Sequence, residues 1–314
     1  MKRAMVVGSA GQDGRILMQR LGREGHFALG IDVQGVQSTA PVDLPAIDIL
    51  QAASVQRAVE LIRPDEVYYL AAFHHSAQDR PDNDAALFEK GFAIHVVGLL
   101  NFLEAIRLAS RQTRLFYAAS SRVFGPPATP LQDESTPLNP DCAYGISKAA
   151  GMRCVRFYRQ VHTLFAASGI LYNHESALRP PQFVTQKIIR GALAIQSGKQ
   201  AKLVLGDLDA TVDWGYAPDY VDAMIRILDQ PQAEDFIIAT GEAHTVREFV
   251  EIVFGLLGLD WKQYVAQAPG LVASQGRSLI GNAGRLRTAT GWRPSVSFAE
   301  MVGLLLSGTA TSTA

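Results

Sequence analysis

The stretch Met5-Val-Val-Gly-Ser-Ala-Gly-Gln-Asp-Gly14 decides the fold of this chain, because a short apolar run ends there in three glycines spaced three apart. The run favours a buried parallel strand over residues 2–7, and the residues after it favour a helix over 13–24. A strand, a glycine turn and a helix in this order predict the first βα unit of an α/β fold.

Each of the three glycines has its own function in such a turn. Gly8 permits the tight turn, Gly11 lets the backbone approach a pyrophosphate, and Gly14 lets the helix pack closely on the strand. Gln12 and Asp13 then lie at the helix N-terminus that faces the phosphates. The spacing matches the dinucleotide-binding pattern only in part, so a glycine-rich surface turn of another α/β protein stays as the alternative.

An acidic residue, Asp32, ends the second expected strand, which covers residues 26–32. It follows the glycines by about 20 positions, where a carboxylate can accept both ribose hydroxyls of an adenosine and repels a 2′-phosphate. Asp32 therefore favours NAD over NADP as the cofactor. Its alternative role is to cap a helix or a turn.

The composition of the 314 residues excludes several classes of protein. With 48% hydrophobic and 19% charged residues the chain can bury a substantial core, and a net charge of −1 without a basic block indicates no nucleic-acid partner. Cys142 and Cys154 form no metal-ligand pattern, so we expect reduced thiols and no metal site. We expect no signal peptide and no apolar stretch as long as a membrane span, and therefore a cytoplasmic protein without a membrane partner.

Strands and helices continue to alternate after Asp32. A loop rich in Pro, Gly and Ser over residues 33–46 precedes Asp48 and Ile49, and a helix follows over about 51–63. Asp48 could cap this helix or meet the amine of an adenine, with Ile49 beside it. The next strand, within residues 64–72, ends in small residues where a cofactor could press against the backbone, namely Leu70, Ala71 and Ala72.

His74 and His75 follow that strand. Neighbouring side chains on an extended chain diverge, so two adjacent histidines without a third ligand do not indicate a metal site. They are expected to line an active site or to be ordinary loop residues.

A long helix is expected over residues 84–110, because apolar residues recur there at helical spacing and are most simply core. These residues are Phe88, Phe92, Val96, Leu99, Leu100, Leu103 and Ile106. A strand over 114–119 then ends at Ser120, and the proline-rich loop 126–140 is expected to form a wall or lid beside the site.

The helix expected over residues 143–168 contains Tyr144 and Lys148. Residues four apart lie on one helical face, so the ammonium can sit near the phenol and favour its ionised form. That would make a base usable near neutral pH. Alone, this spacing equally fits an exposed helix face, but a preceding strand that ends in Ser120 makes a catalytic set the better interpretation.

Several further motifs carry a resemblance to a known family. They are Tyr69-Leu-Ala-Ala72, Tyr172-Asn-His-Glu-Ser176, Phe183-Val-Thr-Gln-Lys187, Asp213-Trp-Gly215, Asp219-Tyr220, Ile238-Ala-Thr-Gly241 and Gly291-Trp-Arg-Pro294. Nearly end to end, the chain resembles the extended short-chain dehydrogenase/reductases that modify nucleotide sugars, and among them the GDP-mannose 4,6-dehydratase family. The Asn-His-Glu-Ser and Asp-Trp-Gly elements are the more specific ones.

The resemblance implies an α/β fold with a Rossmann-like, doubly wound parallel sheet and a smaller C-terminal α/β substrate domain. The dinucleotide-binding domain would take residues 1–173 and a later return of the chain over about 207–240. The substrate-binding domain would take residues 174–206 and 241–314. Relatives commonly dimerise through two long helices, which here are 84–110 and 143–168, so a homodimer or a dimer of dimers is expected.

The implied chemistry begins with oxidation at carbon 4 of the sugar. Tyr144 would take the proton of the hydroxyl, Ser120 would hydrogen-bond the reacting oxygen, and Lys148 would hold the cofactor ribose and lower the pKa of Tyr144. In the dehydratases, a glutamate two residues after the catalytic serine or threonine then serves the elimination of water. Arg122 occupies that position, and an arginine cannot accept a proton, so dehydration is less secure than oxidation.

The resemblance also implies a substrate, a nucleotide-diphosphate sugar that is GDP-linked by kinship. Two arginines that the family uses on the diphosphate correspond to Val212 and Val272. The available replacements are Lys187, Arg190 and Arg277, and Arg179 could also point into the cleft, although each could be ordinary surface charge. Further substrate contacts are expected from Ser121, Asn173, Glu175 and Val184.

The leading hypothesis is therefore an NAD-dependent enzyme with hydride transfer at carbon 4 of a nucleotide-activated hexose or heptose. A 4-epimerase, a 4-keto reductase or a 4-dehydrogenase needs only Ser120, Tyr144 and Lys148, and each stays open. The alternative of another class is an NAD-binding regulatory protein without turnover.

Overall fold

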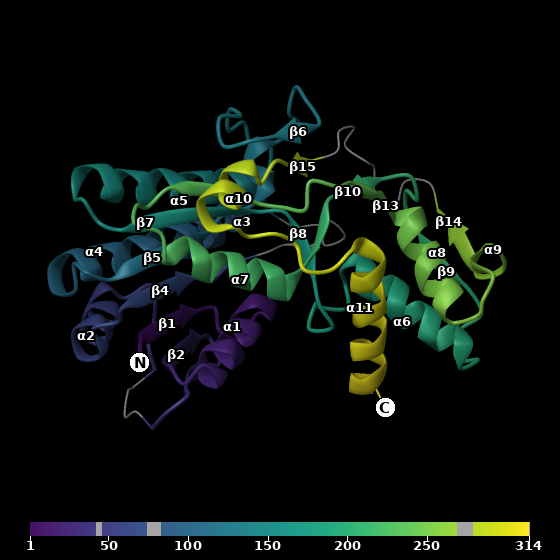
Figure 1. The fold of residues 1–314 in the computed structure, drawn as a ribbon, viewed down its shortest axis with the longest axis horizontal. Helices are drawn as coiled ribbons and strands as arrows, with labels where there is room; N and C mark the ends of the chain where they lie inside the picture. The colour runs from purple at the N-terminus through teal and green to yellow at the C-terminus, as the bar shows by residue number, and fades with distance from the viewer. Residues whose placement is uncertain (42–45, 74–82, 269–278, 314) are drawn as a thin grey trace.

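A seven-stranded sheet forms the centre of the computed structural model, which describes residues 1–41, 46–73, 83–268 and 279–313 (Figure 1). The strand order is β12-β7-β5-β4-β1-β2-β3, and every neighbouring pair is parallel except β2 with β3. The strands are β1 (Arg3–Val7), β2 (Phe27–Asp32), β3 (Gly35–Ser38), β4 (Glu66–Tyr69), β5 (Arg114–Ala118), β7 (Ala166–Leu171) and β12 (Asp235–Ile238). The chain runs outward in both directions from β1 and β4, which confirms the predicted doubly wound, Rossmann-like sheet.

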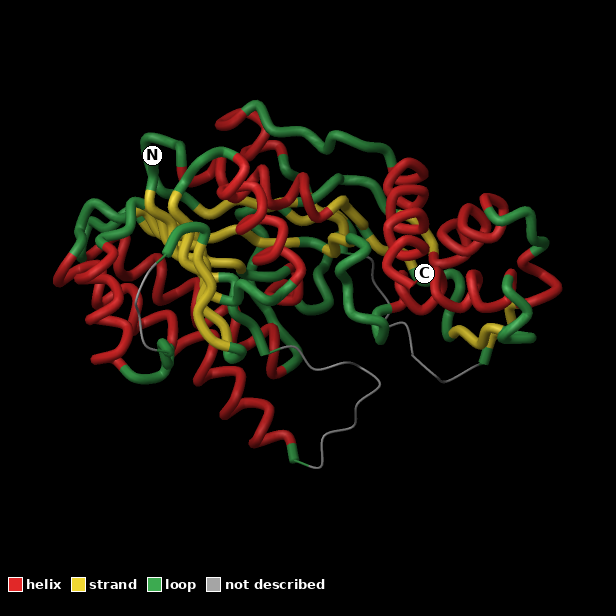
Figure 2. Tube along the Cα trace, turned by 90° about the horizontal axis from the view of Figure 1, so that it is seen from below, coloured by secondary structure: helices red, strands yellow, loops and turns green. Residues whose placement is uncertain are grey.

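Helices cover both faces of this sheet (Figure 2). One face packs against α1 (Gln12–Arg23), α7 (Ala217–Leu228) and α10 (Gly284–Thr290), and the other against α2 (Ala52–Ile62), α4 (Leu99–Ala109) and α5 (Ala143–Val161). Met5 and Val6, neighbours in β1, therefore enter opposite cores and are both fully buried. Burial on both faces explains why the strand is a continuous apolar run.

A third core lies at the end of the molecule opposite the N-terminus (Figure 1). It is formed mainly by α6 (Val184–Gln196), α8 (Val246–Leu256) and α11 (Phe298–Thr313), with α9 (Trp261–Tyr264) and the short pairs β9 (Leu203–Leu205) with β14 (Val265–Gln267) and β10 (Thr211–Val212) with β13 (His244–Thr245). The parallel pair β8 (Asn173–Glu175) and β11 (Trp214–Tyr216) lies between this core and the central sheet. In the loop 126–140, β6 (Leu131–Gln132) pairs with β15 (Ile280–Gly281).

Two of the expected elements are wrong in extent. The loop expected over residues 33–46 contains the edge strand β3, which pairs antiparallel with β2. The helix expected over 143–168 ends at Val161, because Thr163 takes a left-handed backbone conformation with φ of 55° and the buried strand β7 follows. At the C-terminus, the last part of α11 includes Thr309, which is fully buried and hydrogen-bonded to Gln186.

The helix expected over 84–110 is divided into α3 (Asp84–Phe92), a π-helical segment (Ala93–Gly98) and α4. Only its second half belongs to the core, since Leu99, Leu103 and Ile106 are buried while Phe88 is 36% exposed. Among the described residues, 84–109 form one helical stretch that is long and apolar enough to cross a membrane, so the expectation that no stretch reaches that length is wrong. The same length and composition also occur in helices packed within a protein, and α4 packs here on α2.

Candidate active site

The glycine turn brings the ends of β1 and β4 together. Gly8 has a φ of +91°, and a Cβ on it would lie 2.7 Å from the backbone nitrogen of Ala71. A Cβ on Gly14 would overlap the carbonyl oxygen of Gly8, so the first turn of α1 can approach β1 this closely only with glycine there. Gly11 is exposed at the N-cap of α1. The turn therefore leaves the N-terminus of α1 accessible at the switch point of the sheet, where ligands of such folds bind.

A cleft of about 600 Å³ opens at this point. It brings together, from seven different segments of the chain, residues that the sequence predicts as a site: Gly8, Gly11, Gln12, Asp13, Gly14, Asp32, Leu70, Ala72, Ser120, Arg122, Tyr144, Lys148, Asn173 and Arg179. The turn and Asp32 lie at one end, and the Ser–Tyr–Lys set with the two arginines forms the rest. We call these the dinucleotide end and the sugar end.

Other predicted site residues do not line this cleft. Asp48 accepts a hydrogen bond from the Leu50 N–H at 2.9 Å and so closes the turn before α2. Ser121 is buried, and buried Glu175 accepts a hydrogen bond from the Thr185 hydroxyl at 2.7 Å. The remaining ones are Ile49 and Ala71, which pack against the core, and Val184, Lys187 and Arg190 on α6. His74, His75, Val272 and Arg277 lie outside the described residues.

Ser120, Tyr144 and Lys148 meet at the centre of the cleft. The Ser120 hydroxyl is hydrogen-bonded to Tyr144, and Lys148 donates to the Ala118 carbonyl oxygen at 2.7 Å with its Nζ 5.8 Å from the centre of the Tyr144 ring. Burial raises the pKa of Tyr144 to about 12, while the charge of Arg179 and the bond to Ser120 act in the opposite direction. Burial lowers the pKa of Lys148 to about 7. The sequence predicts that Lys148 lowers the pKa of Tyr144. In the structure this pKa is raised instead, because burial outweighs the charge that favours the phenolate, which is that of Arg179.

The Tyr144 ring packs against His95, a residue that no sequence motif indicates. His95 is fully buried in the π-helical segment, and its ring meets the Tyr144 ring edge-on at 5.3 Å. Its Nε2 accepts the Phe73 N–H at 2.9 Å, so Nδ1 carries the proton and donates to the Ser147 hydroxyl at 2.8 Å. π-helical segments are frequent at functional sites, and the lone histidine in an apolar helical run was the available signal.

A second histidine, His174, joins the dinucleotide end to the segment after β7. Its Nδ1 donates to the Tyr172 carbonyl at 2.7 Å and its Nε2 to the Asp13 carboxylate at 2.9 Å, and the ring stacks on Tyr220 at 4.4 Å. Both partners can only accept, so both ring nitrogens are protonated when the two bonds form. Burial opposes the charged pair, but mutual attraction prevails, which raises the pKa of His174 and lowers that of Asp13.

Gln12 adds to the same connection. Its amide nitrogen donates to the His174 carbonyl at 3.1 Å, and its amide oxygen accepts the Ser176 hydroxyl at 2.8 Å. The first turn of α1 is thus tied by two consecutive side chains to residues 174–176. We call this set of contacts, made by Gln12, Asp13, His174 and Ser176, the α1–β8 link.

Asp32 has one structural bond of its own, since its carboxylate accepts the Ala10 N–H at 2.9 Å. This contact fixes the glycine turn against the end of β2 and combines the two roles that the sequence leaves open, a turn cap and a cleft-lining acid. No Lys or Arg follows Asp32 over residues 33–38.

Two arginines border the sugar end. Arg122 has a side chain that is 44% exposed, and its Nη2 lies 3.5 Å from the Asp141 carboxylate. Arg179 stacks on the Phe183 ring at 3.7 Å, with its Nε 3.5 Å from the Glu175 carboxylate. In both pairs the nitrogen and oxygen atoms are farther apart than in a charge-assisted hydrogen bond.

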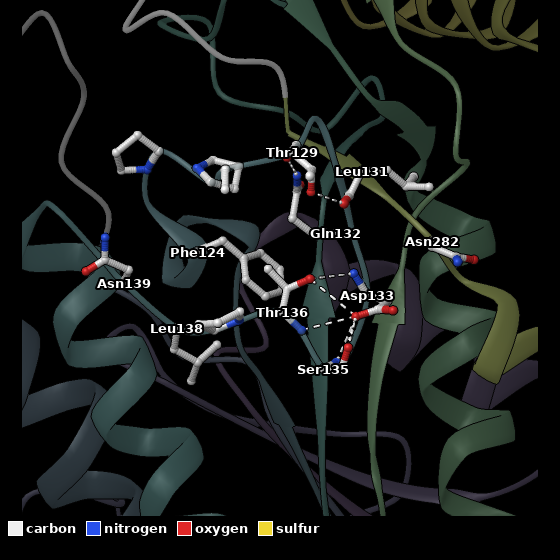
Figure 3. A pocket seen from close by; sticks show the side chains of 14 residues that line it. Phe124, Thr129, Leu131, Gln132, Asp133, Ser135, Thr136, Leu138, Asn139 and Asn282 are labelled. Carbon is white, nitrogen blue, oxygen red and sulfur yellow. Dashed lines mark hydrogen bonds between the residues drawn. The ribbon is translucent and has the colours of Figure 1, made fainter.

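A larger hollow of about 880 Å³ lies beside the loop 126–140 (Figure 3). Its acid, Asp133, accepts hydrogen bonds from the backbone and side chains of Ser135 and Thr136. The amide of Gln132 donates to the carbonyls of Thr129 and Pro130. These polar groups hold the loop together and leave no acid–base pair for catalysis. The described ranges contain no group of three or more potential metal ligands.

Comparison with known proteins agrees with this geometry. The sequence model of the GDP-mannose 4,6 dehydratase family matches residues 5–305. GDP-mannose 4,6 dehydratase 2 of Arabidopsis thaliana is 37% identical over 329 aligned positions, which cover 97% of this chain and 86% of the relative. RMD from Pseudomonas aeruginosa, solved with NADPH, superposes with a TM-score of 0.83 at 22% identity over 99% of this chain and 100% of its own. A dTDP-glucose 4,6-dehydratase from Bacillus anthracis, solved with NAD, superposes with a TM-score of 0.82 at 19% identity. The superposition covers 99% of this chain and 97% of that structure.

Proposed function

The chain belongs to the GDP-mannose 4,6-dehydratase family of short-chain dehydrogenase/reductase enzymes, and from this premise we propose that it oxidises carbon 4 of a nucleotide-diphosphate sugar with NAD. The observation that carries the proposal is the meeting of Ser120, Tyr144 and Lys148 in a cleft that begins at the glycine turn. Relatives that are named as GDP-mannose dehydratases favour a GDP-linked substrate.

The dinucleotide end fits a nicotinamide dinucleotide. The turn at Gly8, Gly11 and Gly14 leaves backbone accessible where side chains would block it, and the N-terminus of α1 favours a pyrophosphate. The Asp32 carboxylate lines the cleft and keeps lone pairs for ribose hydroxyls beside its bond to Ala10. A 2′-phosphate would meet this negative charge without a nearby cation from residues 33–38, which favours NAD over NADP.

The residues of the sugar end are suited to moving one proton. When NAD is bound, it supplies the acceptor for the hydride that leaves carbon 4. The Tyr144 phenolate accepts the proton of the hydroxyl on that carbon, so that a ketone forms, and Ser120 hydrogen-bonds the reacting oxygen. Arg179 and the ammonium of Lys148 favour the phenolate electrostatically. The same groups serve the reverse reaction, in which Tyr144 returns the proton.

Elimination of water is not part of the proposal. It requires a base for the proton on carbon 5, and Arg122 stands where the family places its glutamate. Among the described residues that line the cleft, the acids are Asp13 and Asp32 at the dinucleotide end. The retained set is sufficient for a 4-dehydrogenase, a 4-keto reductase or a 4-epimerase.

Incubation of the purified protein with NAD and GDP-mannose, followed by mass spectrometry, tests the proposal. A product lighter by two hydrogens indicates net oxidation, and an unchanged mass with altered retention indicates an epimerase. Loss of one water would show that elimination proceeds without the glutamate and that the net reaction is dehydration, not oxidation. Binding of a panel of nucleotide sugars without any change in the redox state of NAD would instead favour a regulatory protein.

A further inference from the structure

We infer that the sugar end of the cleft accepts a sugar with a carboxylate next to the reacting carbon, that is, a nucleotide-linked hexuronic acid. This inference rests on the proposed oxidation at carbon 4 and specifies the substrate of the same site. It follows from the distribution of charge along the cleft and from the position of Arg122.

The lining of the cleft carries charged groups of both signs. The acids among its described lining residues, Asp13 and Asp32, lie at the dinucleotide end, and both are engaged, the first by His174 and the second by the Ala10 N–H. The guanidinium groups of Arg122 and Arg179 lie at the sugar end. Their carboxylate neighbours, Asp141 and Glu175, lie at 3.5 Å and form only loose pairs, so an anionic substituent of the sugar can still bind these guanidinium groups.

Arg122 is held beside the reacting position by its own backbone. Its N–H donates to the Ser120 hydroxyl at 3.3 Å, and that hydroxyl is also hydrogen-bonded to Tyr144. The guanidinium reaches along the start of α5, where Cys142 lies 3.7 Å from Nη2. A sugar hydroxyl bound between Ser120 and Tyr144 therefore places the neighbouring ring substituents within the range of this side chain.

The guanidinium of Arg122 retains donors for a ligand. Its carboxylate neighbour, Asp141, is itself 36% exposed and lies at 3.5 Å, so solvent screens the pair and the contact is weak. Three side-chain N–H groups remain besides those that face Asp141 and Cys142, and the planar guanidinium matches the two oxygens of a carboxylate. A lysine would offer only a point charge at this place.

The geometry of the sugar distinguishes a carboxylate from the diphosphate as the partner of Arg122. The diphosphate is attached to carbon 1, across the pyranose ring from carbon 4. A group next to Ser120 instead meets substituents on carbons adjacent to the reacting one, and carbon 5 carries the carboxylate of a hexuronic acid. The carboxylate takes no part in the oxidation, in which the proton passes to Tyr144 and the hydride to NAD.

Two matched pairs of ligands test the inference, GDP-mannose with GDP-mannuronic acid and UDP-glucose with UDP-glucuronic acid. Members of a pair differ only at carbon 6. Titration calorimetry in the presence of NAD, on protein with Tyr144→Phe, measures binding without oxidation and without loss of carbon dioxide from a β-keto acid. In the pair that binds, we expect the uronic acid to bind at least about tenfold more tightly, the size of one hydrogen bond to a charged group.

Arg122→Gln in the same background should abolish this preference, because it removes the partner of the carboxylate. Arg57→Gln removes the same charge from the exposed face of α2 and should leave the preference intact. NAD affinity and melting temperature, measured on each variant, show that the cleft is intact.

The outcomes separate this inference from the function on which it rests. Equal affinity within each pair overturns the inference alone. If Arg122→Gln loses affinity for both members of a pair, Arg122 binds the diphosphate. This result also overturns the inference. Failure of all four ligands to bind in the presence of NAD overturns the proposed function itself.

Discussion

Tyr144 is the residue on which the proposed chemistry depends, because it lines the cleft and its hydroxyl is hydrogen-bonded to Ser120. Tyr144→Phe removes the proton acceptor while keeping the ring against His95. We expect kcat to fall by about 10²–10⁴-fold, the usual contribution of a general base, with little change in the affinity for NAD. Steady-state kinetics and a cofactor titration measure the two effects.

Tyr264→Phe is a matched control for that variant, since it removes a hydroxyl from α9 in the third core, away from the cleft. Its kcat should equal that of the unmodified protein. Full activity of Tyr144→Phe would contradict the assignment of Tyr144 as the base.

Lys148 makes the stability of the cofactor-free protein depend on pH. Its folded-state pKa of about 7 lies below the ordinary value of 10.5. Between these values the unfolded chain binds a proton that the folded protein does not, so the free energy of unfolding rises with pH by up to about 1.4 kcal/mol per unit. Lys148→Met removes this contribution. The difference in unfolding free energy, unmodified protein minus variant, should therefore increase from pH 7 to pH 10.

Urea denaturation at several pH values, without cofactor, measures this difference. Lys202→Met, which removes an ammonium bonded at the surface to the Gln263 carbonyl, should show no such increase. A difference that stays constant with pH for Lys148→Met would mean that the ammonium is not destabilised by burial.

The residues of the site could be predicted where the signal is local. Ser120 ends a strand, and Tyr144 and Lys148 are four apart on one helix, so strand ends and helical spacing identify them. His95 could not be predicted in this way, because its partner Ser147 is 52 positions away and only the packing of two helices brings them together. The second role of Asp32, its bond to Ala10, likewise depends on the closure of the turn.

At the scale of elements, the α1–β8 link fixes the first turn of α1 to β8. His174→Asn removes the ion pair with Asp13 and the stacking on Tyr220. We expect a loss of unfolding free energy of about 1–3 kcal/mol, because a buried carboxylate loses its charged partner, and an increase in KM for NAD. Denaturation and initial-rate measurements test both expectations.

The pH dependence of this loss has a defined sign. The raised pKa of His174 gives a stabilisation that is complete below its ordinary value of 6.5 and is lost as pH rises through the folded-state value. The lowered pKa of Asp13 gives a stabilisation that is complete above the ordinary aspartate pKa of 3.8 and is lost as pH falls through the folded-state value. The effect of His174→Asn should be largest between these values and smaller at pH 9.

A uniform effect across this range would exclude the charged pair. His26→Asn, at a partly exposed position, is the control.

Elements could be predicted where periodicity and boundaries agree. The helix expected over about 51–63 matches α2, whose Val55, Ala58, Val59 and Ile62 are buried on one face. The strand β7 could not be separated from α5 by periodicity, since Leu164 to Ala167 are apolar and fit either structure, and the left-handed Thr163 between them leaves no pattern in the sequence. The strand β3 has no alternating apolar face because it lies at the sheet edge and is largely exposed.

At the scale of the whole molecule, we propose a homodimer formed by the face of α3, the π-helical segment and α5. Apolar side chains are exposed there, including Val97 at 45%, Phe157 at 51% and Val161 at 59%. Phe157→Glu places a charge in this face and should halve the molecular mass in solution. Light scattering after gel filtration measures the mass.

Leu304→Glu is the control for the dimer, because Leu304 is also an exposed apolar residue, at 43%, but lies on α11 at the other end of the chain. This variant should keep the mass of the unmodified protein. An unmodified protein that already has the mass of one chain would refute the dimer.

The α1–β8 link also has a kinetic consequence. Gln12 and Asp13 belong to the turn that would receive the dinucleotide, and their side chains hold residues 174–176, which lead into the wall of the sugar end. We therefore expect that a dinucleotide bound at the dinucleotide end stabilises the sugar end before a sugar binds. We expect compulsory-order kinetics, in which NAD binds first, dissociates last and is retained from one catalytic cycle to the next.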